Sequence, residues 1–189
     1  MAEPSQPVQA YVAVGSNIDP QRNILAALEL LHRRARITGV STFYRTEPLG
    51  SSGQDDFLNG VWGIVTALGP REVKFGLLRP IEDHLGRIRS QDKYGPRTID
   101  LDLVLYGQAV VDEPDLQLPA PDIARPFVAI PLLELAPNLV LPDTHQRLSS
   151  LACSQRRNQR MTAAPDVTQA LRDRLESLRR ENREVQNDE

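Results

Sequence analysis

Four short apolar runs, rich in β-branched residues and bounded by turn residues, predict β-strands at residues 10–14, 37–46, 58–66 and 99–106. Between them, apolar residues recur every three or four positions, which predicts helices from Pro20 and from about residue 70 to Leu85. Asp19 is the expected N-cap of the first helix. The order strand, helix, strand, strand, helix, strand predicts an α+β fold class, a ferredoxin-like split βαβ core with a mainly antiparallel sheet and helices on its faces.

Smaller elements are expected around this core. The runs at 37–46 and 58–66 should form an antiparallel pair, because only a polar loop separates them. The turn Gly107-Gln108 predicts a hairpin between the strand at 99–106 and a short strand at 109–111. A short helix is expected at 130–135.

The composition changes after about Ser154, where Arg and Glu become dominant. We therefore expect a main domain at residues 1–153 and an Arg/Glu-rich, partly helical C-terminal extension at 154–189. Asp166 and Gln169 resemble a capping box. Four later apolar residues fit heptad seam positions, with Asn182 between the last two: Leu171, Leu175, Leu178 and Val185. A solvated or docked terminal helix and self-association through this helix both remain open.

Overall composition excludes several protein classes. Of 189 residues, 40% are apolar and 25% charged, which is typical of soluble globular proteins, and no apolar run is long enough to span a membrane. With no secretory signal pattern at the start, a cytoplasmic location is expected. The net charge of -3 gives no overall attraction to nucleic acid or anionic lipid, so neither is an expected partner. A single cysteine, Cys153, permits neither an internal disulfide nor a cysteine-based metal site.

The strongest chemical signal is a pair of acids in the most apolar predicted strand. Asp100 and Asp102 should point to one face of the sheet, while Leu101, Leu103 and Leu105 point to the other. Two adjacent carboxylates on a partly buried strand are costly unless a cation or arginines neutralise them. Hard oxygen ligands favour magnesium. The alternative is an edge strand whose polar face lies in water.

A basic loop precedes this strand. Arg87, Arg89 and Arg97 can donate forked hydrogen bonds to phosphate oxygens, and a magnesium ion held by two carboxylates usually takes further ligands from phosphates. A merely solvated basic loop is the alternative. Neither a P-loop nor a Gly-x-Gly-x-x-Gly turn is present in the sequence. Together, the acid pair and the arginines favour phosphoryl-transfer chemistry.

Several short motifs in one order resemble those of the 6-hydroxymethyl-7,8-dihydropterin pyrophosphokinase family, over about Tyr11 to Leu151. The matching pieces are Val14-Gly15-Ser16-Asn17, residues 43–50, Phe57-Leu58-Asn59, Gly86-Arg87-Ile88-Arg89, residues 94–102 and Arg125-Pro126-Phe127. Each motif is weak alone, but their joint order and spacing are specific. The resemblance implies an enzyme that transfers the diphosphate of ATP to the pterin hydroxymethyl group, releases AMP and serves folate biosynthesis.

The resemblance also implies roles for individual residues. Asp100 and Asp102 correspond to ligands of two Mg²⁺ ions, and with Arg87 and Arg97 they form the expected catalytic set. The expected ATP-binding residues are Glu82, Arg87, Arg89, Tyr94, Arg97 and Arg125. The pterin is expected to stack between Phe57 and Phe127 and to meet Asn59 and backbone groups near Thr46, Glu47 and Leu49. The partners implied are the small molecules ATP and 6-hydroxymethyl-7,8-dihydropterin.

Two features depart from the family pattern, and two other functions stay open. Many members carry His where this chain has Ala120, so this loop departs from the family pattern, and the segment after Ser154 lies outside the resemblance. One alternative function is a non-enzymatic ferredoxin-like module that binds a nucleotide or RNA. The other keeps the catalysis but uses a related pterin alcohol as acceptor.

Overall fold

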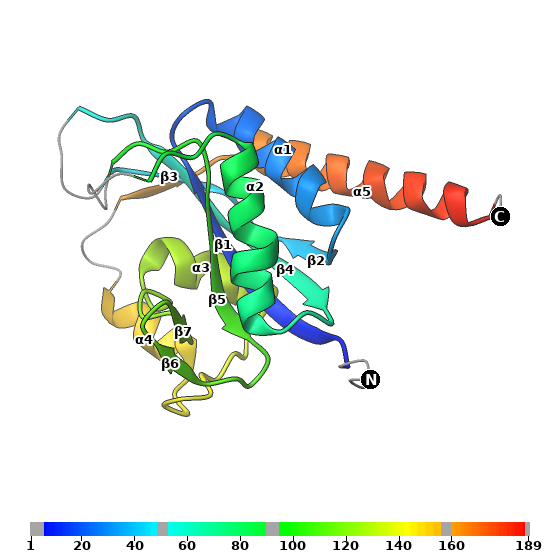
Figure 1. The fold of residues 1–189 in the computed structure, drawn as a ribbon. Helices are drawn as coiled ribbons and strands as arrows, with labels where there is room; N and C mark the ends of the chain where they lie inside the picture. The colour runs from blue at the N-terminus through cyan, green and yellow to red at the C-terminus, as the bar shows by residue number, and fades with distance from the viewer. Residues whose placement is uncertain (1–5, 49–52, 90–94, 156–159, 188–189) are drawn as a thin grey trace.

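A computed structural model of the chain describes residues 6–48, 53–89, 95–155 and 160–187, with backbone alone at 153–155 and 185–187. Within these residues an antiparallel sheet is covered by helices on both faces (Figure 1). The mixed α and β architecture predicted from the sequence is confirmed. Leu49 and Tyr94, two of the expected ligand-binding residues, lie outside the described residues.

The main sheet follows the order β5-β1-β4-β3-β8, and β2 also pairs with β4. Every pair in it is antiparallel. The six strands are β1 (Val8–Ser16), β2 (Arg36–Val40), β3 (Tyr44–Thr46), β4 (Phe57–Thr66), β5 (Asp100–Tyr106) and β8 (Met161–Ala163). The four apolar runs of the sequence therefore form strands, as predicted. The expected pairing of residues 37–46 with 58–66 is confirmed, and the run at 37–46 is divided into β2 and β3.

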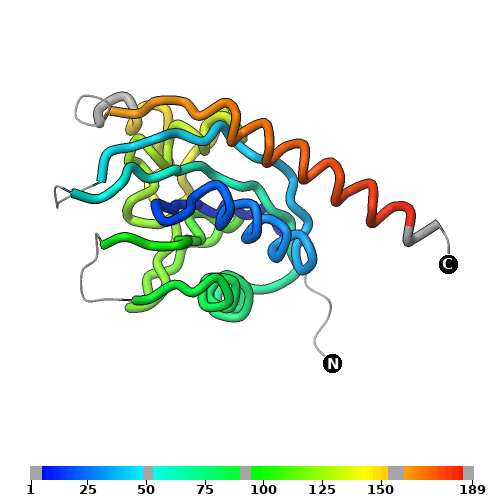
Figure 2. The backbone as a smooth tube through the Cα atoms, turned by 90° about the horizontal axis from the view of Figure 1, so that it is seen from above, coloured from blue at the N-terminus to red at the C-terminus, as the bar shows by residue number. Residues whose placement is uncertain are grey.

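The helices form two layers. On one face lie α1 (Pro20–His32), a π-helical segment η1 (Glu72–Leu78) that continues into α2 (Arg79–His84), and α5 (Pro165–Asn187). On the other face lie α3 (Pro126–Leu135) and α4 (Leu148–Gln155) (Figure 2). Pro80 lies where the π-helix changes to α-helix; it has no N–H to donate, so it disturbs an ordinary helical turn.

Because both faces of the sheet are covered, the strands carry two hydrophobic cores. Val12, Val14 and Trp62 face α1 and belong to the first core, whereas Val61 and Val104 face α3 and belong to the second. This burial on both faces explains why the strands read as nearly continuous apolar runs instead of alternating ones.

Three local expectations need correction. Residues 109–111 do not extend β5 into a hairpin; β6 (Val111–Glu113) pairs with β7 (Leu116–Leu118) in a separate two-stranded sheet. Asp19 does precede α1, but it has a left-handed backbone (φ 41°) and its side chain forms no capping hydrogen bond. Leu105 faces the second core, away from Leu101 and Leu103, because the pairing of β1 with β5 shifts register at a bulge.

The C-terminal segment packs against the rest of the chain. β8 pairs with β3 at the edge of the sheet, and the α5 leucines Leu171, Leu175 and Leu178 are at most 9% exposed. Asn182 contacts His32 of α1, with 3.0 Å between Nδ2 and Nε2. The first part of α5 is thus a docked helix, while its end projects beyond the body (Figure 1). The division of the chain at residue 153 and self-association through α5 stay predictions.

The start of α5 differs from the expected capping box. Asp166 already lies in the first turn of the helix, which begins at Pro165. Gln169 donates to Asp173 one turn further on, at 2.8 Å, so its side chain points away from the start of the helix. None of the helices in the described part of the chain is both long and apolar enough to cross a membrane.

Candidate active site

A pocket of about 670 Å³ opens at one end of the sheet, where β1, β4 and β5 meet the ends of α2 and α3. Its walls contain most of the side chains singled out from the sequence: Thr46, Glu47, Phe57, Asn59, Arg87, Arg89, Arg97, Asp100, Asp102, Arg125 and Phe127. Glu82 lies behind this wall and holds its arginines. The segments that carry these residues are far apart in sequence, and the fold brings them to one place.

Strand register explains how the two halves of the pocket meet. Gly15 of β1 pairs with Asn59 of β4 on one side and with Asp100 of β5 on the other. Paired residues point to the same face of a sheet, so Asn59 and Asp100 flank a position that has no side chain. A Cβ on Gly15 would lie 2.7 Å from the Asn59 Oδ1 atom. Any larger residue here would therefore have to displace the Asn59 amide, which fills the space beside Gly15.

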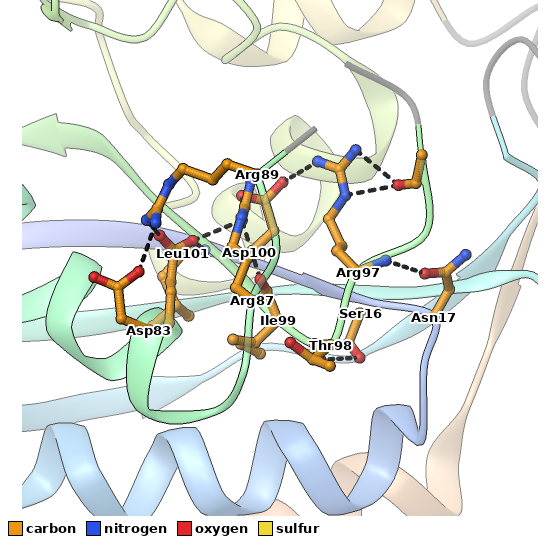
Figure 3. A network of polar contacts seen from close by, with 12 residues as sticks. Ser16, Asn17, Asp83, Arg87, Arg89, Arg97, Thr98, Ile99, Asp100 and Leu101 are labelled. Atoms are coloured by element: carbon orange, nitrogen blue, oxygen red, sulfur yellow. Dashed lines mark hydrogen bonds and ion pairs between the residues drawn. The ribbon is translucent and has the colours of Figure 1, made fainter. Parts of the chain in front are cut away.

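The loop after β1 fixes the segment that carries Arg97. Ser16 Oγ donates to the Thr98 carbonyl at 2.5 Å, and the Asn17 side-chain oxygen accepts from the Arg97 N–H at 2.8 Å. The backbone N–H of Asn17 donates to the Arg97 carbonyl at 3.1 Å. This is the structural role of the Gly15-Ser16-Asn17 motif, and Figure 3 shows the two side-chain contacts, Ser16 with Thr98 and Asn17 with Arg97.

The end of α2 places the second arginine. Gly86 follows the helix with φ 74°, a conformation that glycine adopts without strain, and the chain turns there toward β5. Arg87 Nη1 then reaches Glu82 Oε1 at 2.6 Å, the Ile99 carbonyl at 3.0 Å and Asp100 Oδ1 (Figure 3). Arg97 Nη1 contacts the other oxygen of Asp100 at 2.6 Å. Asp100 thus lies between two guanidinium groups.

Glu82 is the buried centre of this network. Its carboxylate accepts from the Leu101 N–H at 2.9 Å, from Arg87 at 2.6 Å and from Arg89 at 2.7 Å. Burial raises its pKa, and the hydrogen bond and the arginine charges act in the opposite direction. Glu82 is only 4% exposed, so it contacts Arg87 and Arg89 from behind the pocket wall.

Asp102 has a different environment. Its side chain is open to the pocket, but the surrounding walls keep part of the solvent away from it. This partial desolvation, together with the nearby negative charges of Asp100 and Glu82, raises the pKa of Asp102 to about 7. Among the described residues, Asp102 forms no ion pair, and no three side chains of the His, Cys, Asp and Glu types lie close enough to hold a metal by themselves. A divalent cation that takes two carboxylates from the protein and other ligands from phosphate fits this donor set.

The pocket wall also contains aromatic side chains. Phe57 and Phe127 are half-buried in its wall, and the Arg97 guanidinium lies 5.6 Å from the centre of the Phe57 ring. Asn59 Nδ2 donates to Thr46 Oγ1 at 2.7 Å, which orients the amide. Arg125, which also lines the pocket, pairs with Asp122 at 2.8 Å. Ala120, at the position where the family resemblance leads one to expect His, also lines the pocket.

Sequence reasoning missed Lys74. It lies in η1, lines the pocket, and its charge acts to lower the pKa of Asp102. A lysine on an amphipathic helix gives no signal that separates it from an ordinary surface residue. Only the position of η1 against β5 shows that its charge faces the acid pair.

Comparison with known proteins shows that the chain is a diphosphotransferase, a kind of enzyme. The chain belongs to the family described as 7,8-dihydro-6-hydroxymethylpterin-pyrophosphokinase, whose model matches residues 11–137. The enzyme reading is thus favoured over the non-catalytic module.

Individual relatives agree. The Pseudomonas aeruginosa 2-amino-4-hydroxy-6-hydroxymethyldihydropteridine pyrophosphokinase is 42% identical over 139 residues, which cover 71% of this chain and 85% of that protein. The Haemophilus influenzae protein of the same name is 38% identical over 141 residues, covering 72% and 87% of the two chains. A solved HPPK-DHPS structure in complex with substrates shares the fold with a TM-score of 0.58 at 12% identity, over 78% of this chain and 43% of that one.

Proposed function

We propose that this chain transfers the diphosphate of ATP to the hydroxymethyl group of 6-hydroxymethyl-7,8-dihydropterin, a step of folate biosynthesis. Family membership supports the reaction type, and the relatives carry this substrate in their names. The observation that supports it best is the register of β4, β1 and β5, which puts the amide of Asn59 next to the acid and arginine cluster. We therefore propose adjoining places for a flat heterocycle and a triphosphate in this one pocket.

The bond changes follow from this arrangement. The hydroxymethyl oxygen of the pterin attacks the β-phosphorus of ATP, and its proton passes to solvent. The bond from the β-phosphorus to the oxygen that it shares with the α-phosphorus breaks, and AMP leaves with that oxygen. Arg87 and Arg97 are proposed to bind phosphate oxygens and to stabilise the charge that develops on them. Phe57 and Phe127 are proposed to hold the pterin ring, with Asn59 and the Thr46-Glu47 backbone at its polar edge. Leu49 is proposed to complete that edge.

Magnesium is part of this proposal. Asp100 and Asp102 would hold it, and the repulsion between their nearby negative charges would favour a cation there. Bound there, two Mg²⁺ ions would supply positive charge for phosphoryl transfer. Arg89, Tyr94 and Arg125 are proposed to line the nucleotide side, and Glu82 is proposed to act there from behind the wall by holding Arg87 and Arg89. We also propose that the antiparallel sheet, in the order β5-β1-β4-β3, is a ferredoxin-like core. A cytoplasmic location stays a prediction.

The test is the identity of the nucleotide product. Protein, ATP, magnesium and the hydroxymethyl pterin should yield AMP and pterin diphosphate in equal amounts, measured by chromatography. ADP as the product would reject diphosphate transfer. Chelation with EDTA should stop the reaction, and Asp100→Ala should lower turnover by at least about a hundredfold. Competition between the pterin and related pterin alcohols decides the acceptor.

A further inference from the structure

The outer side of β3 is held by a segment we name the C-terminal clamp, residues 161–172, which comprises β8 and the start of α5. Tyr44 pairs with Ala163 and Thr46 with Met161 across this edge of the sheet. The inner side of β3 pairs with β4, where Tyr44 faces Asn59 and Thr46 faces Phe57. A strand of three residues is thus enclosed between the pocket and the clamp.

The strongest clamp contacts are buried hydrogen bonds to Phe43, the residue before β3. Phe43 N–H donates to Thr168 Oγ1 at 2.9 Å, and the Phe43 carbonyl accepts from the Ala164 N–H at 2.8 Å. Thr168 in turn donates to the Ala164 carbonyl at 2.9 Å. Phe43 is fully buried and Thr168 is 4% exposed, so water cannot replace these bonds at low cost.

A second contact holds the chain ahead of β3. The Arg172 guanidinium donates to the Val40 carbonyl at 3.2 Å from Nε and 3.1 Å from Nη2. The clamp therefore fixes the backbone on the N-terminal side of β3 as well as the strand itself. Together with the Phe43 contacts, it fixes where β3 enters the sheet.

On the pocket side, β3 sets the direction of an amide. Thr46 is 1% exposed, and its Oγ1 accepts from Asn59 Nδ2 at 2.7 Å. The other end of this amide lies against Gly15, so a shift of β3 would turn or displace Asn59. Displacements of about 1 Å in a binding residue can cost large factors in activity.

We propose that the C-terminal clamp positions the pterin-binding edge of the pocket, with Thr168 as its central positioning residue. This inference rests on the proposed function, because it takes Asn59 and Thr46 as pterin contacts. The clamp lies beyond residue 137, where the family match ends. It is thus a means by which this chain supports its substrate strand from outside the matched region.

The test separates pterin binding from nucleotide binding. Thr168→Val keeps the shape of the side chain but removes the hydroxyl, whereas Thr168→Ser keeps the hydroxyl. We expect Thr168→Val to raise KM for the pterin by about fivefold or more and to leave KM for ATP within about twofold. Thr168→Ser should retain the KM of the unmodified protein. Should Thr168→Val not fold, Arg172→Gln weakens the same clamp and should change the same constant.

Leu175→Ala is the matched control, because it weakens the docking of α5 at a buried position that makes none of the hydrogen bonds to β3. It should lower the melting temperature without changing KM for the pterin. An equal rise in KM for Leu175→Ala and Thr168→Val, or no rise for Thr168→Val, would overturn the proposal. Asn59→Ala distinguishes failure of the proposed function from failure of the clamp proposal. If Asn59→Ala leaves KM for the pterin unchanged, the pterin role of Asn59 and the clamp proposal are both wrong. If Asn59→Ala raises this KM but Thr168→Val does not, only the clamp proposal is wrong.

Discussion

Asp102 offers a prediction in which stability and activity move in opposite directions. Its carboxylate is partly desolvated and lies near Asp100 and Glu82, so the folded protein favours its neutral form, with a pKa of about 7. The unfolded chain ionises this group near its ordinary pKa of about 3.9. As pH rises between these two values, the unfolded state gains more from ionisation than the folded state, and stability is lost. Above pH 7 the loss is complete and constant.

The size of the effect follows from the same comparison. The difference of about three between the pKa of Asp102 in the folded and in the unfolded state corresponds to about 4 kcal/mol of unfolding free energy. Asp102 is exposed to the pocket, however, and water and salt screen its charge, so we discount the effect to roughly 1–2 kcal/mol. Asp102→Asn should therefore stabilise the protein by that amount at pH 8 without magnesium. For a chain of this length each kcal/mol raises the melting temperature by about 2–4 °C.

Thermal melts of both proteins in EDTA, at several pH values, provide the assay. The stability gain of Asp102→Asn should be full at pH 8 and shrink toward pH 4. In a separate assay with magnesium, AMP release by this variant should be lower by at least about a hundredfold. Asp112→Asn is the control, since Asp112 is an exposed acid of β6 outside the pocket and should change the melting temperature little. If the melting temperature of Asp102→Asn at pH 8 is equal to or lower than that of the unmodified protein, the carboxylate is not under electrostatic strain and our reasoning is wrong.

Three further substitutions test other parts of the pocket. Arg87→Ala should lower kcat for AMP release by about a hundredfold to a thousandfold, because it removes a charge donor proposed to act on the phosphates; an unchanged kcat would contradict that role. Gly15→Val should raise KM for the pterin by at least about tenfold, since its side chain would meet the amide of Asn59, and a normal KM would show that the amide can move aside. Lys74→Met should raise KM for ATP by about threefold or more at low salt, with Lys74→Arg as the control; equal constants for both would exclude a role for this charge.

The sequence predicted the parts of the fold that bury much apolar surface. Strands β1, β4 and β5 are nearly continuous apolar runs because both faces of the sheet are covered. The strand β8 escaped prediction, because Met161-Thr162-Ala163 has no apolar pattern and pairs only where α5 docks beside it. The pairing of β6 with β7 was missed for the same reason: three-residue strands carry little pattern of their own.

For the site, the sequence predicted residue types better than their contacts. The acid pair and the arginines stood out because such charges are unusual near an apolar strand. Their pairing did not, since it depends on the turn at Gly86 and on the two strands beside Gly15. Phe57 and Phe127 were named from the family resemblance, and alone they would have read as core residues. Tyr94 and Leu49 lie outside the described residues, so their roles stay proposals.

The ion pairs of Asp100 bear on the metal role proposed for this residue. Arg87 and Arg97 both contact Asp100 here, yet the proposed reaction needs the acid to face a cation and the arginines to face phosphates. A magnesium–nucleotide complex carries both a cation and negatively charged phosphates. On its binding, Asp100 would exchange its arginine partners for magnesium, and Arg87 and Arg97 would exchange Asp100 for phosphate oxygens. The exchange thus leaves no charge of this trio unpaired, which is the costly case inside a pocket. Asp102, which forms no such pair among the described residues, would therefore gain more from the proposed cation than Asp100 would.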